Sequence, residues 1–418
     1  RREEVAITLD KPWEGNTSLY ALVVHHDGGY RMYYRGSHVE GGPGGSSAHE
    51  PVLCMVESED GLEWERPNLG IVEFQGSTEN NILWKGSDAR NFAPFIDGNP
   101  DAAPEAKYKA VARGRGKNLL AFQSPDGLHW EPLVDNPILT GSWFDSHNIA
   151  FWDADRQEYR IYFRDAIPIE DGTLRGIKTA TSADFVNWSE PKFLEWEPDA
   201  PRVHLYTNAV QLYPRAPHLF IGFPARFHPD REDMVEPLLM TSRDGLTFHR
   251  WEEALIRPGR NADRWHNRSN YVNTGIMVTP SPLPGEDSEL SILTNEDYYK
   301  GKDTRFRRYS WRLDGFVSLH TFAEGGEVVT KPFTFTGSEL RLNYSTAVAG
   351  HLRVEIQDAA GNPIEGFALD DMEPLYGDEL DGVIKWRTGG DLSALAGQTV
   401  RLRFELKDAD IYAFRFGS

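Results

Sequence analysis

Residues 58–64, Ser-Glu-Asp-Gly-Leu-Glu-Trp, decide the fold, because the same phrase returns along the chain. Three later copies begin at Ser124, Ser182 and Ser242, and a shortened fifth copy runs from Arg312 to Phe316. The copies are roughly 60 residues apart, which is typical of repeated β-sheet units that bury their faces against their neighbours. Five copies predict a five-bladed β-propeller.

The phrase has the chemistry of a tight turn followed by a wedge. Its Asp can cap backbone N–H groups, and its Gly accepts dihedral angles that other residues avoid. The aromatic residue that ends the phrase, Trp64 in the first copy, is expected to drop between neighbouring sheets. We therefore interpret the repeat as structural rather than catalytic.

Length, net charge and apolar content argue against some classes of protein, among them nucleic-acid-binding and membrane-spanning proteins. The 418 residues are enough for two or three domains. A net charge of −20 argues against nucleic acid as a partner, although a pocket on an acidic protein can be locally basic. No apolar run approaches the length of a membrane span, and the lone Cys54 is expected to be buried and inert. No signal peptide is visible, and we expect an extracellular or periplasmic location.

Short runs of alternating apolar and aromatic residues predict three or four strands in each repeat. Beyond residue 325, evenly spaced strands continue without the phrase. We predict an all-β fold, with a catalytic five-bladed β-propeller over residues 1–324 and a small β-sandwich over residues 325–418. The sandwich fits either a carbohydrate-binding module or a brace. The lack of an obvious exposed aromatic row favours the brace.

The second predicted strand of each repeat ends on a charged residue. These residues are Arg35, Arg113, Arg164, Arg226 and Glu296. A propeller gathers equivalent positions of its blades around one channel. Since Arg offers a planar fork that matches carboxylate, sulfate or phosphate, the pattern indicates an anionic group in the ligand, or else ion pairs between blades.

A second set of candidate residues lies at the predicted starts of the innermost strands and in one loop. This loop follows a Gly-rich stretch, residues 41–47, that we interpret as a lip over the pocket. The set consists of Trp13, Glu14, His49, Glu50, Asn91, Asp145, His147, Asn148, Asn208, Arg268 and Tyr271. Trp13 could stack on a sugar face, and the polar side chains could bind its hydroxyl groups.

The acids Glu14, Glu50, Asp145 and Glu296 come from different repeats and could converge. Paired carboxylates are what glycoside hydrolysis needs, one as general acid and the other as nucleophile or base. His147 could instead act as the base of an elimination reaction. No His or Cys spacing supports a metal site. We expect no cofactor, and a structural Ca2+ would have no motif behind it.

Several segments together resemble a known group of proteins. They include "SEDGLEWERPNLGIVEF", "NNILW", "FDSHNIAFWD", "YTNAVQLYPRAPHLFIGFPARF", "SRDGLTFHRW" and "RRYSWRLDGFVSL". The chain is similar over nearly its whole length to bacterial proteins described as glycoside hydrolase family 32-like. The resemblance implies a propeller followed by a small β-sandwich. In the wider superfamily of fructosidases, arabinanases, xylosidases and anhydro-galactosidases, it implies an Asp from blade one, an Asp from blade two and a Glu as general acid.

The sequence departs from that superfamily pattern at the site residues. The Trp-Met-Asn-Asp-Pro-Asn segment of the fructosidases is absent, and blade one offers Asp10 and Glu14 instead. Blade two begins with Asn91, and its nearest acid is Asp97. The resemblance therefore carries over no catalytic role residue by residue.

Three functions remain open at the level of sequence. The first is a hydrolase acting on a uronic-acid or sulfated oligosaccharide, with Glu14 or Asp145 as nucleophile or base and Glu296 or Glu50 as acid. The second is a lyase or dehydratase acting on a uronic acid, with His147 or a Tyr as base. The third is a glycan-binding protein without catalysis.

Overall fold

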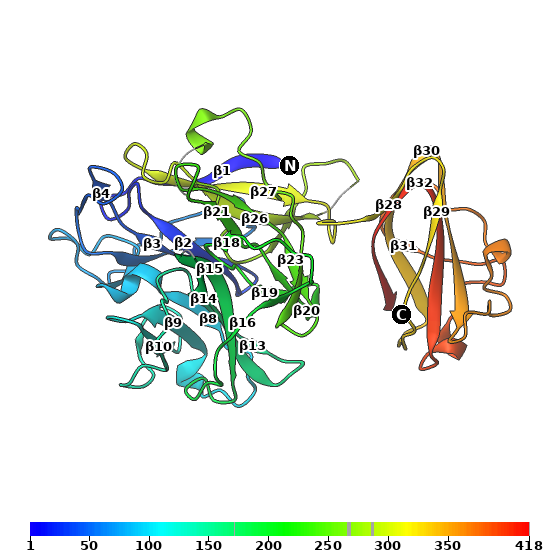
Figure 1. The fold of residues 1–418 in the computed structure, drawn as a ribbon, viewed down its shortest axis with the longest axis horizontal. Coiled ribbons are helices and arrows are strands. Elements are labelled where there is room, and N and C mark those ends of the chain that lie inside the picture. Colours follow the sequence, from blue (N-terminus) through cyan, green and yellow to red (C-terminus); the bar gives the residue numbers. More distant parts are fainter. Residues whose placement is uncertain (171, 266–268, 286–287, 418) are drawn as a thin grey trace. The chain divides into compact units, whose positions relative to one another are not determined.

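The computed structural model describes residues 1–170, 172–265, 269–285 and 288–417, which form two compact units, Arg1–Ser310 and Trp311–Ser418 (Figure 1). Strands dominate both units, so the predicted all-β fold is confirmed. The helices among the described residues are short 3₁₀ turns: η1 (Asp88–Asn91), η2 (Pro104–Ala106), η3 (Ala262–Arg264), η4 (Leu369–Asp371) and η5 (Ser393–Leu395).

The first unit consists of five successive blades. Blade one contains β2 (Leu19–His26), β3 (Gly29–Gly36), β6 (Val52–Ser58) and β7 (Ile82–Lys85), with a small hairpin of β4 (Val39–Glu40) and β5 (Ser46–Ser47) between β3 and β6. Blade two contains β8 (Ala93–Ile96), β9 (Tyr108–Arg113), β10 (Asn118–Ser124), β11 (Glu131–Pro132) and β12 (Leu139–Thr140). Blade three contains β13 (Ile149–Asp153), β14 (Glu158–Ile169), β15 (Gly172–Ser182) and β16 (Lys192–Phe193).

The last two blades depart from this simple pattern. Blade four contains β17 (Glu195–Trp196), β19 (Gln211–Tyr213), β20 (Ala216–Gly222), β23 (Met240–Ser242) and β24 (Thr247–Arg250), beside a three-stranded sheet of β18 (His204–Leu205), β21 (Ala225–His228) and β22 (Met234–Pro237). Blade five contains β25 (Met277–Pro280), β26 (Ser288–Glu296), β27 (Thr304–Trp311) and, at its outer edge, β1 (Arg2–Leu9). The five predicted blades are present.

The innermost strands of neighbouring blades touch one another around a closed ring. β2 contacts β8, β8 contacts β13, and β13 contacts β19. Blade four meets blade five where the Gln211 side-chain oxygen accepts a hydrogen bond from the Ile276 N–H at 3.2 Å. Blade five returns to blade one through Thr274, whose main chain bonds to Ala21 at 3.1 Å and to Val23 at 2.8 Å. The ring brings the ends of five inner strands to a common axis.

The repeated phrase packs each blade against the one before it. In the second copy, the Asp126 carboxylate accepts a hydrogen bond from the Leu128 N–H at 2.8 Å, as the turn chemistry predicts. Arg31 on β3 of blade one donates to the Asp126 carbonyl at 2.8 Å. Gly127 has a φ of +74°, and a Cβ there would stand 2.5 Å from the Tyr33 hydroxyl of blade one. The glycine is therefore required both by its dihedral angle and by the closeness of the neighbouring blade.

The outer strand of blade five comes from the beginning of the chain. β1 pairs antiparallel with β27, and Leu9 lies opposite Thr304 (Figure 1). The shortened fifth copy of the phrase follows β27. The position beside β27 at the outer edge of blade five is occupied by β1, so the chain continues from there into the second unit. The sequence pattern did not predict β1, because that strand carries no copy of the phrase.

The second unit is built around two long strands, β30 (Glu339–Asp358) and β32 (Val400–Gly417), which pair along most of their length. β28 (Leu319–Thr321), β29 (Gly326–Val329) and β31 (Asp378–Val383) complete one five-stranded sheet over a separate apolar core. Since β28 pairs with β32, the residues from Trp311 onward belong to this unit. The two compact units divide between residues 310 and 311, whereas the sequence pattern predicts a domain boundary at residue 325. The domain assignment and the two-layer sandwich stay predictions.

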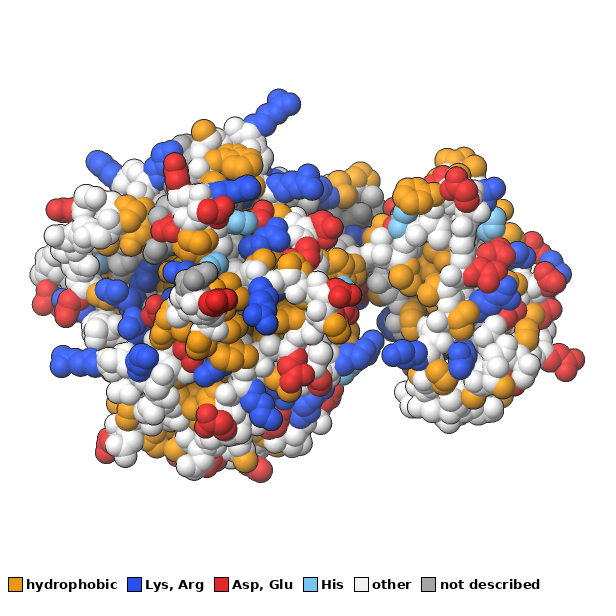
Figure 2. Space-filling model, viewed as in Figure 1, with side chains coloured by type: hydrophobic (Ala, Val, Ile, Leu, Met, Phe, Trp, Pro, Cys, Tyr) orange, Lys and Arg blue, Asp and Glu red, His pale blue; other side chains and the backbone are white. Residues whose placement is uncertain are grey.

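The molecular surface mixes charges of both signs. On the visible face of each unit, acidic and basic side chains lie among one another (Figure 2). No helix among the described residues has the length and apolar character to cross a membrane.

Closure of the ring by β1 gives a stability prediction. Leu9 on β1 is fully buried in a cluster with Phe306 of β27, so Leu9→Ala should destabilise the chain by about 2–5 kcal/mol. Urea unfolding followed by tryptophan fluorescence measures the change. Thr8→Ala, an exposed position on the same strand, should shift stability by less than about 0.5 kcal/mol. Equal effects of the two variants would contradict a closing role for β1.

Candidate active site

A cavity of about 210 Å³ opens where all five blades meet. Its lining contains Tyr20 and Arg35 of blade one, Arg90, Asn91 and Arg113 of blade two, Asp145 before β13 of blade three, Tyr206 after β18 of blade four, and Tyr298 and Tyr299 after β26 of blade five. The β3–β6 connection supplies a further wall: Ser37, Val39, Ser47, His49 and Pro51. The cavity therefore lies at one mouth of the propeller axis, which is the usual place for a ligand in this architecture.

Three guanidinium groups face this cavity without a compensating acid. Arg35, Arg90 and Arg113 make no ion pair with any carboxylate among the described residues. Arg35 is almost fully buried and donates to the Thr17 carbonyl at 2.6 Å and to the Tyr298 hydroxyl at 3.1 Å, both of them neutral oxygens. Arg90 is exposed at the edge of the cavity, and partial desolvation, followed by the positive charges of Arg35 and Arg113, lowers its pKa. The mouth thus concentrates positive charge on a protein whose net charge is −20.

A fourth arginine is paired. Arg164 of β14 lies 2.6 Å from the Asp145 carboxylate and stacks over the Tyr206 ring at 4.1 Å. The second Asp145 oxygen and the Arg164 Nε and Nη1 atoms are buried and have no partner among the described residues. Of the described residues that line the cavity, Asp145 alone is acidic.

Four tyrosines form the aromatic part of the wall. Arg35 lies over the Tyr20 ring at 5.0 Å, and the rings of Tyr298 and Tyr299 meet edge to face at 4.6 Å. Burial raises the pKa of the Tyr20 phenol, which therefore stays protonated at neutral pH. Tyrosines supply both stacking surfaces and hydroxyl groups, as a sugar requires.

His147 lies beneath this wall rather than in it. Its ring stacks on Tyr20 at 5.2 Å, and its side chain is buried. Burial, assisted by the positive charge of Arg35, lowers the pKa of His147 to about 3. An imidazole with so low a pKa is a weak base, so the geometry gives His147 a supporting place under Tyr20.

The other predicted acids do not line the cavity. Glu14 is buried against Arg66, whose Nε lies 3.0 Å and Nη2 2.9 Å from its two oxygens, and it also accepts from the Tyr34 hydroxyl. Glu296 is enclosed by four guanidinium groups, those of Arg2, Arg264, Arg305 and Arg307. Glu50 is exposed next to the lining residue His49. The negative charges of the buried Glu14 and Glu296 are compensated by the arginines beside them, so both residues form structural ion pairs.

Several other predicted binding residues also lie elsewhere. Arg226 pairs with Glu236 at 2.6 Å on the sheet beside blade four. Trp13 donates to Asn81 at 2.8 Å and packs in the core of blade one. Tyr271 is buried, with its ring centroid 5.5 Å from that of Tyr206, and it is not part of the lining. Arg268 lies outside the described residues.

The predicted asparagines hold the inner strands together. Asn91 donates to the Ser146 carbonyl at 2.7 Å, Asn148 to the Phe144 carbonyl at 3.1 Å, and Asn208 to the His147 carbonyl at 3.1 Å. All three amides are buried, and of the three only Asn91 lines the cavity. Asn91 and Asn208 satisfy carbonyl groups of a neighbouring blade, and Asn148 satisfies one within the segment that leads into β13.

Sequence reasoning missed Arg90 and the four tyrosines as a set. Arg90 directly precedes Asn91 in η1, so reading one position before the inner strand would have found it. Tyr298 and Tyr299 lie in the β26–β27 loop, which no repeat marks. Backbone φ angles of +63° at Asp297 and +61° at Tyr299 shape this loop.

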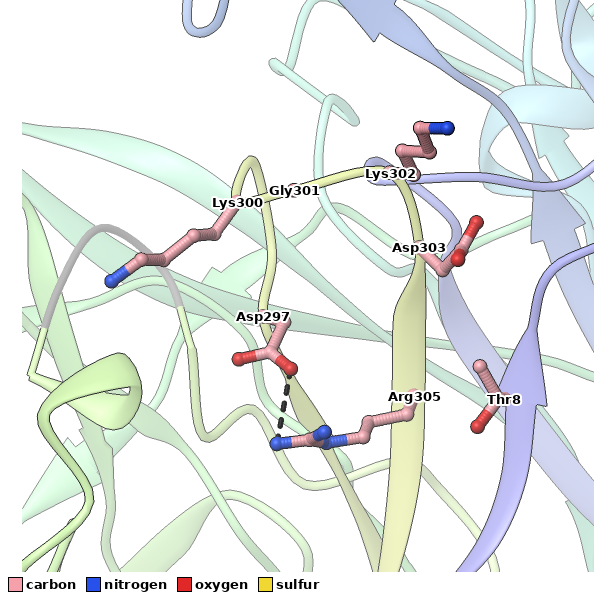
Figure 3. Close-up of a pocket in the computed structure, with 7 residues that line it drawn as sticks. All are labelled: Thr8, Asp297, Lys300, Gly301, Lys302, Asp303 and Arg305. Carbon is pink, nitrogen blue, oxygen red and sulfur yellow. Dashed lines mark ion pairs between the residues drawn. The ribbon is translucent and has the colours of Figure 1, made fainter.

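A second cavity, of about 320 Å³, is lined by Thr8, Asp297, Lys300, Gly301, Lys302, Asp303 and Arg305. Figure 3 shows Lys300 and Lys302 extending away from one another, while Asp297 is ion-paired with Arg305 at 3.0 Å. None of the described residues in this lining is aromatic. Its charges do not converge, so the cavity at the propeller mouth is the candidate active site.

No protein-family model matches the chain, and no curated protein sequence matches it. Among solved structures, it is similar to an N-acetylgalactosamine deacetylase from F. plautii, with 14% identity and a TM-score of 0.48 over 74% of this chain and 93% of the other. A glycoside hydrolase family 43 arabinoxylan arabinofuranohydrolase from Bacillus subtilis has 11% identity and a TM-score of 0.48 over 98% and 96%. The catalytic domain of a GH62 α-L-arabinofuranosidase from Coprinopsis cinerea has 13% identity and a TM-score of 0.46 over 74% and 98%.

The buried imidazole predicts how stability depends on pH. Between roughly pH 6 and 4 the unfolded chain binds a proton at His147, whereas the folded protein, with a His147 pKa of about 3, does not. Stability should therefore fall on acidification, by up to about 1.4 kcal/mol per pH unit from this group. In His147→Gln that contribution should vanish, so the free energy of unfolding falls less steeply over this range.

Urea unfolding at a series of pH values measures this slope. His218→Gln, at an exposed position on β20, is the matched control and should keep the wild-type slope. An unchanged slope in His147→Gln would contradict a neutral buried imidazole.

Proposed function

We propose that this protein is a carbohydrate-active enzyme that binds a uronic acid residue at the propeller mouth and cleaves its glycosidic bond by elimination. One observation carries the proposal: Arg35, Arg90 and Arg113 face one cavity with no compensating carboxylate among the described residues. Guanidinium groups brought together in this way repel one another, and an anionic ligand relieves the repulsion. The tyrosine wall adds the stacking surface that a sugar ring needs.

The charge of the cavity favours elimination over hydrolysis. Glycoside hydrolysis passes through a transition state that resembles a positively charged oxocarbenium ion, and it uses two carboxyl groups. Elimination from a uronic acid builds negative charge on the sugar's carboxylate, which nearby arginines stabilise. The described lining contains three arginines and Asp145 as its one acid, and Asp145 is itself paired with Arg164, so the electrostatics oppose the first route and support the second.

The proton transfers fall to tyrosines in this proposal. A base removes the proton from C5, the C4–C5 double bond forms, the bond from C4 to the leaving oxygen breaks, and that oxygen takes up a proton. Tyr298 is the proposed base, because Arg35 donates to its hydroxyl oxygen at 3.1 Å and would stabilise a phenolate. Tyr20, which lines the same cavity, is the proposed proton donor to the leaving oxygen.

Hydrolysis is the second candidate, because Asp145 presents one carboxylate oxygen that has no partner among the described residues. Asp145 could then serve as general base for water, with a tyrosine as acid. The two reactions differ in their products. Elimination leaves an unsaturated sugar that absorbs in the ultraviolet, and hydrolysis adds the mass of water.

The arginine cluster predicts a loss of anion affinity without a loss of stability. Arg90→Ala should weaken binding of glucuronate about 10- to 100-fold, since a hydrogen bond to a charged group contributes about 1.5–3 kcal/mol. The same change should leave the free protein as stable as wild type, because it relieves repulsion from Arg35 and Arg113.

Calorimetric titration with glucuronate, and with glucose as the neutral counterpart, measures the affinity. Arg115→Ala removes one exposed charge just beyond the end of β9 and is the matched control. Equal losses in Arg90→Ala and Arg115→Ala would mean that general charge, and not this cavity, attracts the anion.

The reaction class is tested on uronic-acid oligosaccharides with parallel ultraviolet and mass detection. We expect an unsaturated product from wild type and a loss of about 100-fold or more in kcat for Tyr298→Phe, which keeps the ring but removes the proton carrier. Tyr376→Phe, at an exposed position of the second unit, should retain full activity. A product that has gained water, with full activity in Tyr298→Phe, would replace elimination by hydrolysis.

A further inference from the structure

We propose that Asn16 is a positioning residue that couples two walls of the cavity at the propeller mouth. One wall is the full lip, residues 37–51, in which the β4–β5 hairpin brackets the Gly-rich stretch of residues 41–47. The other is the tyrosine loop, residues 297–303, which carries Tyr298 and Tyr299. The effect on ligand binding rests on the proposed function, whereas the coupling itself rests on the contacts of Asn16.

The Asn16 side chain holds the lip with both ends of its amide. Its Nδ2 donates to the Val39 carbonyl at 3.0 Å, and its Oδ1 accepts from the Val39 N–H at 3.0 Å. Its backbone N–H points to the His38 Nδ1 atom at 3.4 Å. Val39 is itself a lining residue, so these bonds fix the position of the cavity wall.

The same residue also holds the tyrosine loop. The Asn16 carbonyl accepts from the Tyr299 N–H at 2.7 Å, and its Nδ2 lies 3.4 Å from the Gly301 carbonyl. Asn16 is only 5% exposed, and removal of its side chain would take a partner from both Val39 backbone groups and from the Gly301 carbonyl, whereas the bond from Tyr299 to the Asn16 backbone carbonyl would remain. One buried amide therefore links segments that are separated by more than half of the chain.

The neighbours of Asn16 extend this junction to the anion site. The Gly15 carbonyl accepts from the Thr304 hydroxyl at 2.9 Å at the start of β27, and the Thr17 carbonyl accepts from Arg35 at 2.6 Å. Gly15 has a φ of +140°, and a Cβ there would stand 2.5 Å from the His38 Nδ1 atom. Residues 15–17 thus connect lip, tyrosine loop and anion-binding arginine within one short segment.

The chemistry requires an amide at this position. Asn16→Asp keeps an acceptor for the Val39 N–H but replaces the Nδ2 donor by a carboxylate oxygen that faces two carbonyl groups. Asn16→Ala removes both. Asn80 is a matched control, since it is 4% exposed, donates to the Val72 carbonyl at 2.8 Å and accepts from the Ile82 N–H at 2.9 Å, and does not line the cavity.

Two measurements on the full chain test the proposal. Hydrogen exchange needs no ligand, and it should become faster in both the lip and the tyrosine loop of Asn16→Asp and Asn16→Ala. In Asn80→Ala, exchange in these two segments should match wild type. Titration with glucuronate should show affinity reduced about 5- to 20-fold in the Asn16 variants and unchanged in Asn80→Ala.

The outcomes separate this inference from the proposed function. Faster exchange in only one of the two segments, or equal changes in the Asn80 control, would overturn the coupling role of Asn16. Glucuronate affinity equal to wild type in both Asn16 variants would overturn its effect on the site. If wild type binds no glucuronate, the proposed function fails, while the exchange data still decide on the coupling.

Discussion

Closure of the ring is the constraint on which the rest of this structure depends. Blade five combines β1, from the first residues of the propeller, with β25, β26 and β27, from its last residues, and the pairing of β1 with β27 joins the two. Only in a closed ring do the ends of five inner strands share one axis, which places Arg35 of blade one beside Arg113 of blade two and Tyr298 of blade five. A break at this seam would separate the residues of the cavity without changing any of them.

Two groups of arginines in the same propeller show opposite electrostatic designs. At Glu296, four guanidinium groups surround one buried carboxylate, and burial is offset by ion pairs within the fold. At the mouth, Arg35, Arg90 and Arg113 gather with no such acid among the described residues. The second arrangement contributes no ion pair to the folded protein, and this contrast is the basis of the proposed anion site.

Buried amides form the frame that keeps this charged mouth in place. Asn91 of blade two and Asn208 of blade four each satisfy a backbone carbonyl of the segment before β13 of blade three, and Asn148 satisfies one within that segment. An amide suits this position because it donates and accepts without adding charge beside the arginines. Asn16 applies the same chemistry to loops instead of strands, which ties the walls of the cavity to the rigid ring.

The repeat, and through it the propeller, could be predicted from the residues alone, because an Asp-Gly turn and its aromatic residue are local chemistry that recurs wherever a third strand ends. The sequence also indicated Arg35, Arg113, Arg164 and Asp145, since equivalent positions of successive blades must converge. The folded chain was needed to show that Glu14, Glu296 and Arg226 are ion-paired with neighbours. It was also needed to show that β1 completes blade five and that Tyr298 and Tyr299 line the cavity. Whether a charge is compensated depends on partners far away in sequence, and the spacing of residues along a chain carries no record of them.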